Sequence, residues 1–196
     1  MADDDIRLSA EPPWDESTRP TAPQPAEEAE YGEGALAVGQ HLVDVHDMLR
    51  SELEELRKIL AQVRDGALGA GDARSALNDM ALRQNDWTLG AFCSRYCNGV
   101  ARHHSLEDGS IFPHLARSEP ELGPVIDRLG EEHLVIHHAI EGVDAALVHH
   151  INNPGEYGAL QDALDFLTDA LLSHLSYEER ELVEPLARHG FYPGQV

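Results

Sequence analysis

Apolar residues recur at steps of three and four over four long segments, and this period constrains the fold more than any other feature of the sequence. The first segment carries Leu42, Val45, Leu49, Leu53, Leu56 and Leu60, and the fourth carries Leu160, Leu164, Leu167 and Leu171. Such spacing places side chains on one face of an α-helix, with 3.6 residues per turn. Strand-like alternation of useful length is absent from the sequence, so it predicts an all-α protein.

Short breaks separate the four segments. We expect helices over about residues 35–64, from Asn85-Asp86 with last turns disturbed by Pro113, from the Glu119-Pro120 break to about 151, and over about 156–188. A short helix over 73–82 is expected in the first connection, and Gly190 is expected to close the last helix. Long helices joined by short connections predict an up-down-up-down four-helix bundle.

The first 30 residues differ from the rest in composition. They contain many acids, almost no apolar period, and the prolines Pro12, Pro13, Pro20, Pro23 and Pro25. Such composition is typical of disorder. We therefore divide the chain into a disordered acidic arm over 1–30 and one bundle domain over 35–190.

Charge and hydropathy restrict the partners. The formal net charge is −22, and a polyanion repels nucleic acid and acidic membrane surfaces. The opening Met-Ala-Asp-Asp-Asp lacks the positive charge of a secretory signal, so we expect a cytoplasmic protein. The sequence does not indicate a protein partner.

Cys93 and Cys97 are too few for a disulfide framework, and we interpret them as small buried residues.

Histidines interrupt the apolar stripes in a regular way. The chain has 12 histidines and only 4 phenylalanines. Three helices carry pairs spaced by four residues, which are His103 with Glu107, His133 with His137, and His174 with Glu178. The first helix offers His46, with His41 as its alternative. Residues four apart share one helix face, so each pair can point into the bundle.

This inventory of five imidazoles and two carboxylates indicates a metal centre. An ionised glutamate on a core stripe is costly unless a cation lies beside it. Nitrogen and oxygen donors that include carboxylates suit iron or manganese. One ion does not need seven protein ligands, whereas two ions that share bridging carboxylates do.

Doubled histidines leave the register open at two places. His104 forms a second spacing-of-four pair with Asp108, and His138 competes with His137. We prefer His103 because Glu107 lies on the apolar stripe. Glu179 is interpreted as part of a solvated face.

A ferritin-like centre needs Glu-x-x-His pairs, and none of the histidines has a glutamate three positions before it.

Several of these stretches resemble the hemerythrin family of cation-binding helices. They are 103–108 followed by Ile111-Phe112-Pro113, 174–179 followed by Pro185, Glu132-His133, and 46–50, within a similarity that spans about 35–188. The Phe-Pro spacing also matches the His103 register. Glu178 lies four residues after His174, as in bacterial and regulatory relatives rather than oxygen carriers.

The resemblance implies a centre of two iron ions bridged by two carboxylates and an oxo or hydroxo group. Its ligands would be His46, His103, Glu107, His133, His137, His174 and Glu178, with Glu107 and Glu178 as the bridges. An open position at such a centre binds a small diatomic molecule or peroxide.

Three functions follow from such a centre. The first is binding or sensing of O2 or NO, and the second is an enzyme that disproportionates H2O2 or reduces NO. The third is iron handling or a purely structural metal. The bundle uses nearly all of the chain, which favours redox defence over a sensor that relays to a fused domain.

Overall fold

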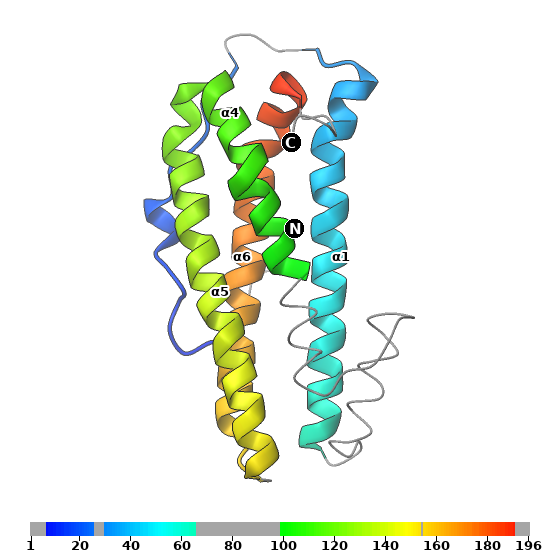
Figure 1. Cartoon of the computed structure of the whole chain (residues 1–196), viewed down its shortest axis with the longest axis vertical. Coiled ribbons are helices and arrows are strands. Elements are labelled where there is room, and N and C mark those ends of the chain that lie inside the picture. Colours follow the sequence, from blue (N-terminus) through cyan, green and yellow to red (C-terminus); the bar gives the residue numbers. More distant parts are fainter. Residues whose placement is uncertain (1–6, 26–29, 66–98, 154, 191–196) are drawn as a thin grey trace.

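A computed structural model describes residues 7–25, 30–65, 99–153 and 155–190, and this part of the chain is all helical. Its α-helices are α1 (Glu33–Arg64), α4 (Phe112–Ser118), α5 (Gly123–Asn152) and α6 (Gly158–His189). Figure 1 shows long helices lying side by side along one axis. Among the described residues, no helix combines the length and apolarity required to cross a bilayer. The all-α prediction is confirmed.

The predicted helix boundaries agree with these elements where they can be compared. α5 begins at Gly123, after the 3-10 turn η3 (Pro120–Leu122), and α6 ends at His189, with Gly190 as its C-cap. Gly190 has a φ of 67°, a left-handed conformation that glycine adopts without steric cost. The expected helix over 73–82, the Asn85-Asp86 cap and both cysteines lie outside the described residues.

The helix that precedes α4 contains a π-helical turn. Residues 99–106 are helical and continue through η2 (Glu107–Ile111) into α4. The Phe112 N–H bonds to the Glu107 carbonyl, five residues back, and Pro113 then follows without an N–H of its own. The buried positions follow this irregularity, because the step from Glu107 to the next buried residue, Phe112, is five. The π turn thus lets polar and apolar residues of one helix face the same interior.

Consecutive helices α5 and α6 run in opposite directions, and α6 packs against both α1 and α5 (Figure 1). Because residues 66–98 lie outside the described part, the complete up-down-up-down order stays a prediction.

Two apolar clusters fill the bundle, and a polar layer lies between them. The larger cluster includes Leu49 of α1, Ile136 of α5 and Leu171 of α6, and the smaller one includes Leu42, Leu129 and Leu182 of the same helices. The buried polar residues His46, His133 and Glu178 fall between these positions along each helix. The apolar clusters fix the helix faces, and the layer between them collects the polar side chains.

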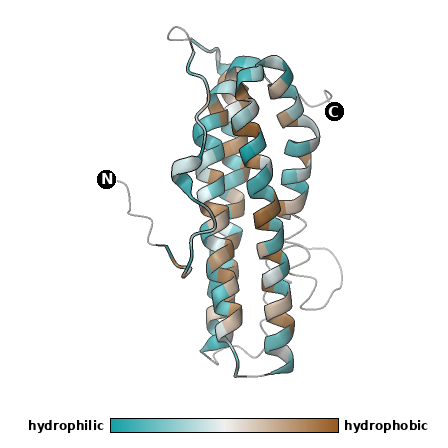
Figure 2. Cartoon of the chain, turned by 90° about the vertical axis from the view of Figure 1, so that its left-hand side faces the viewer, coloured by the Kyte–Doolittle hydropathy of each residue, from teal (hydrophilic) through white to brown (hydrophobic). Residues whose placement is uncertain are grey.

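The disorder expected for residues 1–30 is not confirmed. Residues 7–25, which we call the N-terminal strap, run lengthwise along the outside of the helices (Figure 2). Asp15 caps a 3-10 turn, η1 (Glu16–Thr18), by accepting a hydrogen bond from the Ser17 N–H. Ala22 packs into the smaller apolar cluster. Local turns and contacts with helices therefore order a segment whose composition alone suggests disorder.

Candidate metal centre

The polar layer contains two groups of potential metal ligands. The first group is His104, His133 and His174, and the second group is His46, His103, Glu107 and Glu178. Within each group, the ligand atoms all lie within 4.8 Å of one another. These seven side chains come from α1, the 99–111 helical segment, α5 and α6. Only His103 is less than fully buried.

Each glutamate lies between the histidines of the first group and those of the second group. Glu107 Oε1 is 3.0 Å from His103 Nε2 in the second group, and Glu107 Oε2 is 3.6 Å from His133 Nε2 in the first. Glu178 Oε2 is 3.5 Å from His46 Nε2 and 3.6 Å from His174 Nε2. Both carboxylates therefore occupy positions from which one side chain can reach two cations.

The imidazoles are oriented by partners on their outer side. His46 Nδ1 lies 2.9 Å from Glu179 Oε1, and His133 Nδ1 lies 2.9 Å from Asp108 Oδ1. His174 Nδ1 lies 3.2 Å from Glu132 Oε2. A carboxylate only accepts hydrogen bonds, so it fixes the proton on Nδ1 and leaves the Nε2 lone pair directed inward. Metal-binding histidines have such carboxylate partners as a rule.

Seven of the inward atoms lack hydrogen-bond partners. They are Nε2 of His104, His133 and His174, and both carboxylate oxygens of Glu107 and Glu178. Buried polar atoms are rarely left unsatisfied, and cations held in the two groups would satisfy these atoms. The donors are nitrogen and oxygen without sulfur, which suits iron or manganese. The residues of the layer thus fit a metal centre.

The ionisation of the layer agrees with this fit. Burial raises the pKa of Glu107 and of Glu178 well above the usual range, and the neighbouring Glu107 charge adds to the shift at Glu178. Burial and the surrounding imidazoles lower the pKa of His46 and of His133 to about 2. Neutral imidazoles are the form that binds metal. Because both acids resist ionisation alone, the layer favours a cation that compensates their charge.

The structure separates the histidines that the sequence left as alternatives. His46 is buried in the second group, whereas His41 is exposed. His103 and His104 both enter the layer, one in each group. His137, expected as a ligand, is in neither group, and its Nε2 lies 3.2 Å from His104 Nδ1.

The remaining alternatives lie outside both groups. His138 is exposed, and its Nδ1 contacts the Leu134 carbonyl. Asp108, the alternative partner of His104, orients His133 instead. Asp108 lies inside the π turn that begins at Glu107, where the helical phase changes, so the spacing of four from His104 does not bring it into the buried layer.

Sequence reasoning missed three outer residues. Glu179, predicted to lie on a solvated face, contacts His46. Arg19, which belongs to the arm predicted to be disordered, contacts Glu132. The sequence identifies Glu132 only as the neighbour of His133 in the Glu132-His133 pair. Its position three residues after the buried Leu129 and four before the buried Ile136 is the available signal, because that spacing places its carboxylate on an apolar face.

Comparison with family models agrees with the geometry of the layer. The model of the hemerythrin HHE cation-binding domain matches residues 38–186, which include all seven side chains of the two groups. Searches among curated proteins and among solved structures found no match. On the extent of that match, the chain belongs to the hemerythrin HHE cation-binding domain family.

Proposed function

We propose that the chain is a cytoplasmic non-haem di-iron protein, built on an up-down-up-down bundle, that binds or reacts with a small molecule such as O2, NO or H2O2. Glu107, Glu178 and an oxo or hydroxo group would bridge the two ions. Defence against oxidative or nitrosative stress is the context that we infer. Neither nucleic acid nor a membrane is proposed as a partner, since the net charge is −22.

One observation carries the proposal, which is the position of the two buried glutamates between two sets of imidazoles. Each carboxylate lies within 3.6 Å of a histidine from both groups. Two carboxylates this deeply buried would repel each other if ionised without a cation. A site for one ion would need neither the second glutamate nor the seventh ligand.

The chain's own residues would set the conditions of the chemistry. Iron held by imidazoles and carboxylates supplies an open coordination position and electrons to a small ligand. The apolar clusters on either side exclude water from the layer. Glu179, Asp108 and Glu132 hold the imidazole rings in one tautomer.

Metal analysis and an optical spectrum of the purified full-length protein test the centre. We expect two irons per chain and an oxo-bridge charge-transfer band. His133→Ala should lose iron, whereas His138→Ala on the same helix should retain it, because His138 is exposed. A wild-type chain that binds no iron, or equal losses from both variants, would refute the proposal.

The type of reaction is tested on the loaded protein. Oxygen evolution on addition of H2O2 would support peroxide disproportionation. A reversible spectral change with O2 or NO after reduction would support binding, and NO consumption would support its reduction. A centre that responds to none of these reagents would contradict a reactive site and favour a structural metal.

Iron affinity should fall as the pH falls. Because burial raises the pKa of Glu107 and of Glu178, the metal-free protein holds protons there that iron must displace. Lower pH favours the protonated form and weakens binding. Competition with a chelator at pH 6 and at pH 7.5 measures the difference, and equal affinities would contradict the buried carboxylates as ligands.

A further inference from the structure

The N-terminal strap is attached to the bundle by specific polar contacts on α6. The Ser9 N–H and hydroxyl lie 2.7 and 2.6 Å from Asp169 Oδ2. Near the other end of the strap, the Ala22 N–H donates to Glu181 Oε2 at 2.7 Å. These contacts lie about three helical turns apart on α6, so the strap follows the helix rather than touching it at one point.

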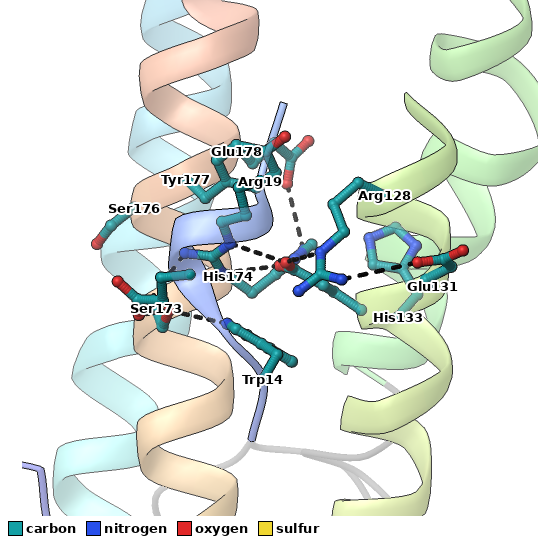
Figure 3. Close-up of polar contacts among 12 residues, drawn as sticks. Trp14, Arg19, Arg128, Glu131, His133, Ser173, His174, Ser176, Tyr177 and Glu178 are labelled. Atoms are coloured by element: carbon teal, nitrogen blue, oxygen red, sulfur yellow. Dashed lines mark hydrogen bonds and ion pairs between the residues drawn. The ribbon is translucent and has the colours of Figure 1, made fainter. Parts of the chain in front are cut away.

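Between these two attachments, Arg19 enters the interior of the protein. Its side chain is only 5% exposed, and its guanidinium forms a two-pronged ion pair with Glu132, with Nε 2.8 Å from Oε1 and Nη2 2.9 Å from Oε2. It also lies 4.5 Å from the centre of the Tyr177 ring. Figure 3 shows Arg19 and Arg128 converging from the strap and from α5 beside His174. A planar guanidinium paired in this way fixes the orientation of the carboxylate.

Glu132 transmits this orientation to the metal layer. Its Oε2 lies 3.2 Å from His174 Nδ1, while His174 Nε2 points into the first group of ligands without a partner. The Glu132 carboxylate, paired with Arg19, accepts a hydrogen bond from the Nδ1–H of His174 and leaves Nε2 free to bind a cation.

We propose that the strap completes the metal centre from outside, with Arg19 as a positioning residue that holds Glu132 and, through it, His174. This inference rests on the proposed metal centre. It assigns a role to a segment before the first helix of the bundle, outside the residues 38–186 that the family model matches. A segment that lies outside the helices thereby controls one of the ligands.

Arg128 makes the inference testable without loss of the fold. Its Nε lies 2.8 Å from Glu132 Oε1, so Glu132 keeps one cationic partner when Arg19 is removed. Removal of Arg19 therefore changes how the carboxylate is oriented more than whether it is paired. Arg180 is the matched control, since it also lies against the Tyr177 ring, at 5.2 Å, but it pairs with Glu181 and is 60% exposed.

The experiment compares full-length wild type, Arg19→Ala, Arg19→Lys and Arg180→Ala. Iron per chain, chelator competition and the absorption spectrum of the cobalt-substituted protein are measured, with thermal unfolding of the metal-free forms as a check. Arg19→Ala should bind metal about 10- to 100-fold more weakly, the usual loss for an outer partner of a ligand, and should shift the cobalt bands. Arg19→Lys should recover part of the affinity, and Arg180→Ala should match wild type.

The outcomes separate this inference from the proposed function. If wild type binds two irons and Arg19→Ala equals Arg180→Ala in affinity and spectrum, the inference is overturned and the centre stands. If Arg19→Ala does not fold, an Arg19→Lys variant with wild-type affinity and spectrum overturns it equally. If wild type binds no metal, the proposed function and this inference fail together.

Discussion

Two histidines of the layer are each held by a row of contacting side chains that runs from the histidine to a glutamate and then to an arginine. We call such a row a chain of contacts, and the two chains lie in different surroundings. On the α1 side, His46 contacts Glu179, and Glu179 Oε1 lies 2.7 Å from Arg50 Nη1. Arg50 and Glu179 are 27% and 22% exposed. This chain, which we call the helical chain, lies wholly between α1 and α6 at the edge of the solvent.

The chain on the α5 side is buried and needs the strap. It consists of His174, Glu132 and Arg19, and Glu132 and Arg19 are 1% and 5% exposed. We call it the strap chain. An ion pair in solvent contributes little to stability, whereas loss of one member of a buried pair leaves a charge without compensation. Two sets of side chains with the same chemistry therefore contribute differently to stability when one set is buried and the other is partly exposed.

The largest expected effect comes from removing the glutamate of each chain. Glu132→Ala leaves Arg19 buried without its carboxylate and should lower the free energy of unfolding by about 3–5 kcal/mol. Glu179→Ala should lower it by about 1 kcal/mol or less. Urea unfolding of the metal-free proteins measures both. Equal losses would show that burial does not distinguish the chains.

A methyl group at Gly39 should disturb the packing of α1 against α6, the two helices that carry the helical chain. A Cβ at this position would lie 2.7 Å from the Val183 carbonyl oxygen, where α1 and α6 approach closely. We expect Gly39→Ala to cost about 1–3 kcal/mol, because the two backbones must move apart. Gly142→Ala on α5 is the control, since nothing lies within 4 Å of its Cβ and alanine favours the helix. Destabilisation by both variants in urea would argue against close helix approach as the cause.

Loss of one hydroxyl should loosen the strap. The Tyr177 phenol donates to the Pro20 carbonyl at 2.7 Å, so Tyr177→Phe should cost about 0.5–1.5 kcal/mol and increase hydrogen exchange over residues 7–25. Tyr157→Phe removes a similar bond to the Leu60 carbonyl, away from the strap. That variant should be destabilised without changed exchange in the strap. Unchanged exchange in Tyr177→Phe would show that this bond does not hold the segment.

The smallest effect concerns salt. Arg50→Ala should cost about 1 kcal/mol or less at low ionic strength, and the cost should disappear near 0.5 M NaCl, because exposed charges are screened over about a Debye length. The cost of Arg19→Ala should persist at the same salt concentration. Unfolding curves at the two ionic strengths give both values. A salt-independent cost for Arg50→Ala would mean that the helical chain is effectively buried.

Much of the layer could be predicted from local spacing. His46, His133, His174, Glu107 and Glu178 lie on apolar stripes, and the structure places them together because a helical face is a property of sequence period. Register at the doubled histidines could not be predicted. Both members of His103-His104 enter the layer, one in each group, and spacing along a single helix does not reveal this.

The residues that contact the histidines from outside the layer could not be predicted from the sequence for a different reason. In the sequence, Glu179 and Asp108 have the features of ordinary surface acids. Only the packing of α6 against α1 brings Glu179 to His46, and only the packing of the η2 turn against α5 brings Asp108 to His133. The prolines and acids of the strap are typical of disorder. The contacts that order it join residues more than 100 positions apart, such as Arg19 and Glu132, and the sequence does not reveal them.

The sequence by itself determined the helical class, the inward faces of the helices and the chemistry of the donors, because period and side-chain type are local properties. Tertiary structure alone decided that His103 and His104 join different groups, that His137 and His138 join neither, and which charges hold the imidazoles from outside. These choices depend on how helices and strap meet in space. The free energy that favours them comes from burial and from pairing between distant residues, which no local pattern contains.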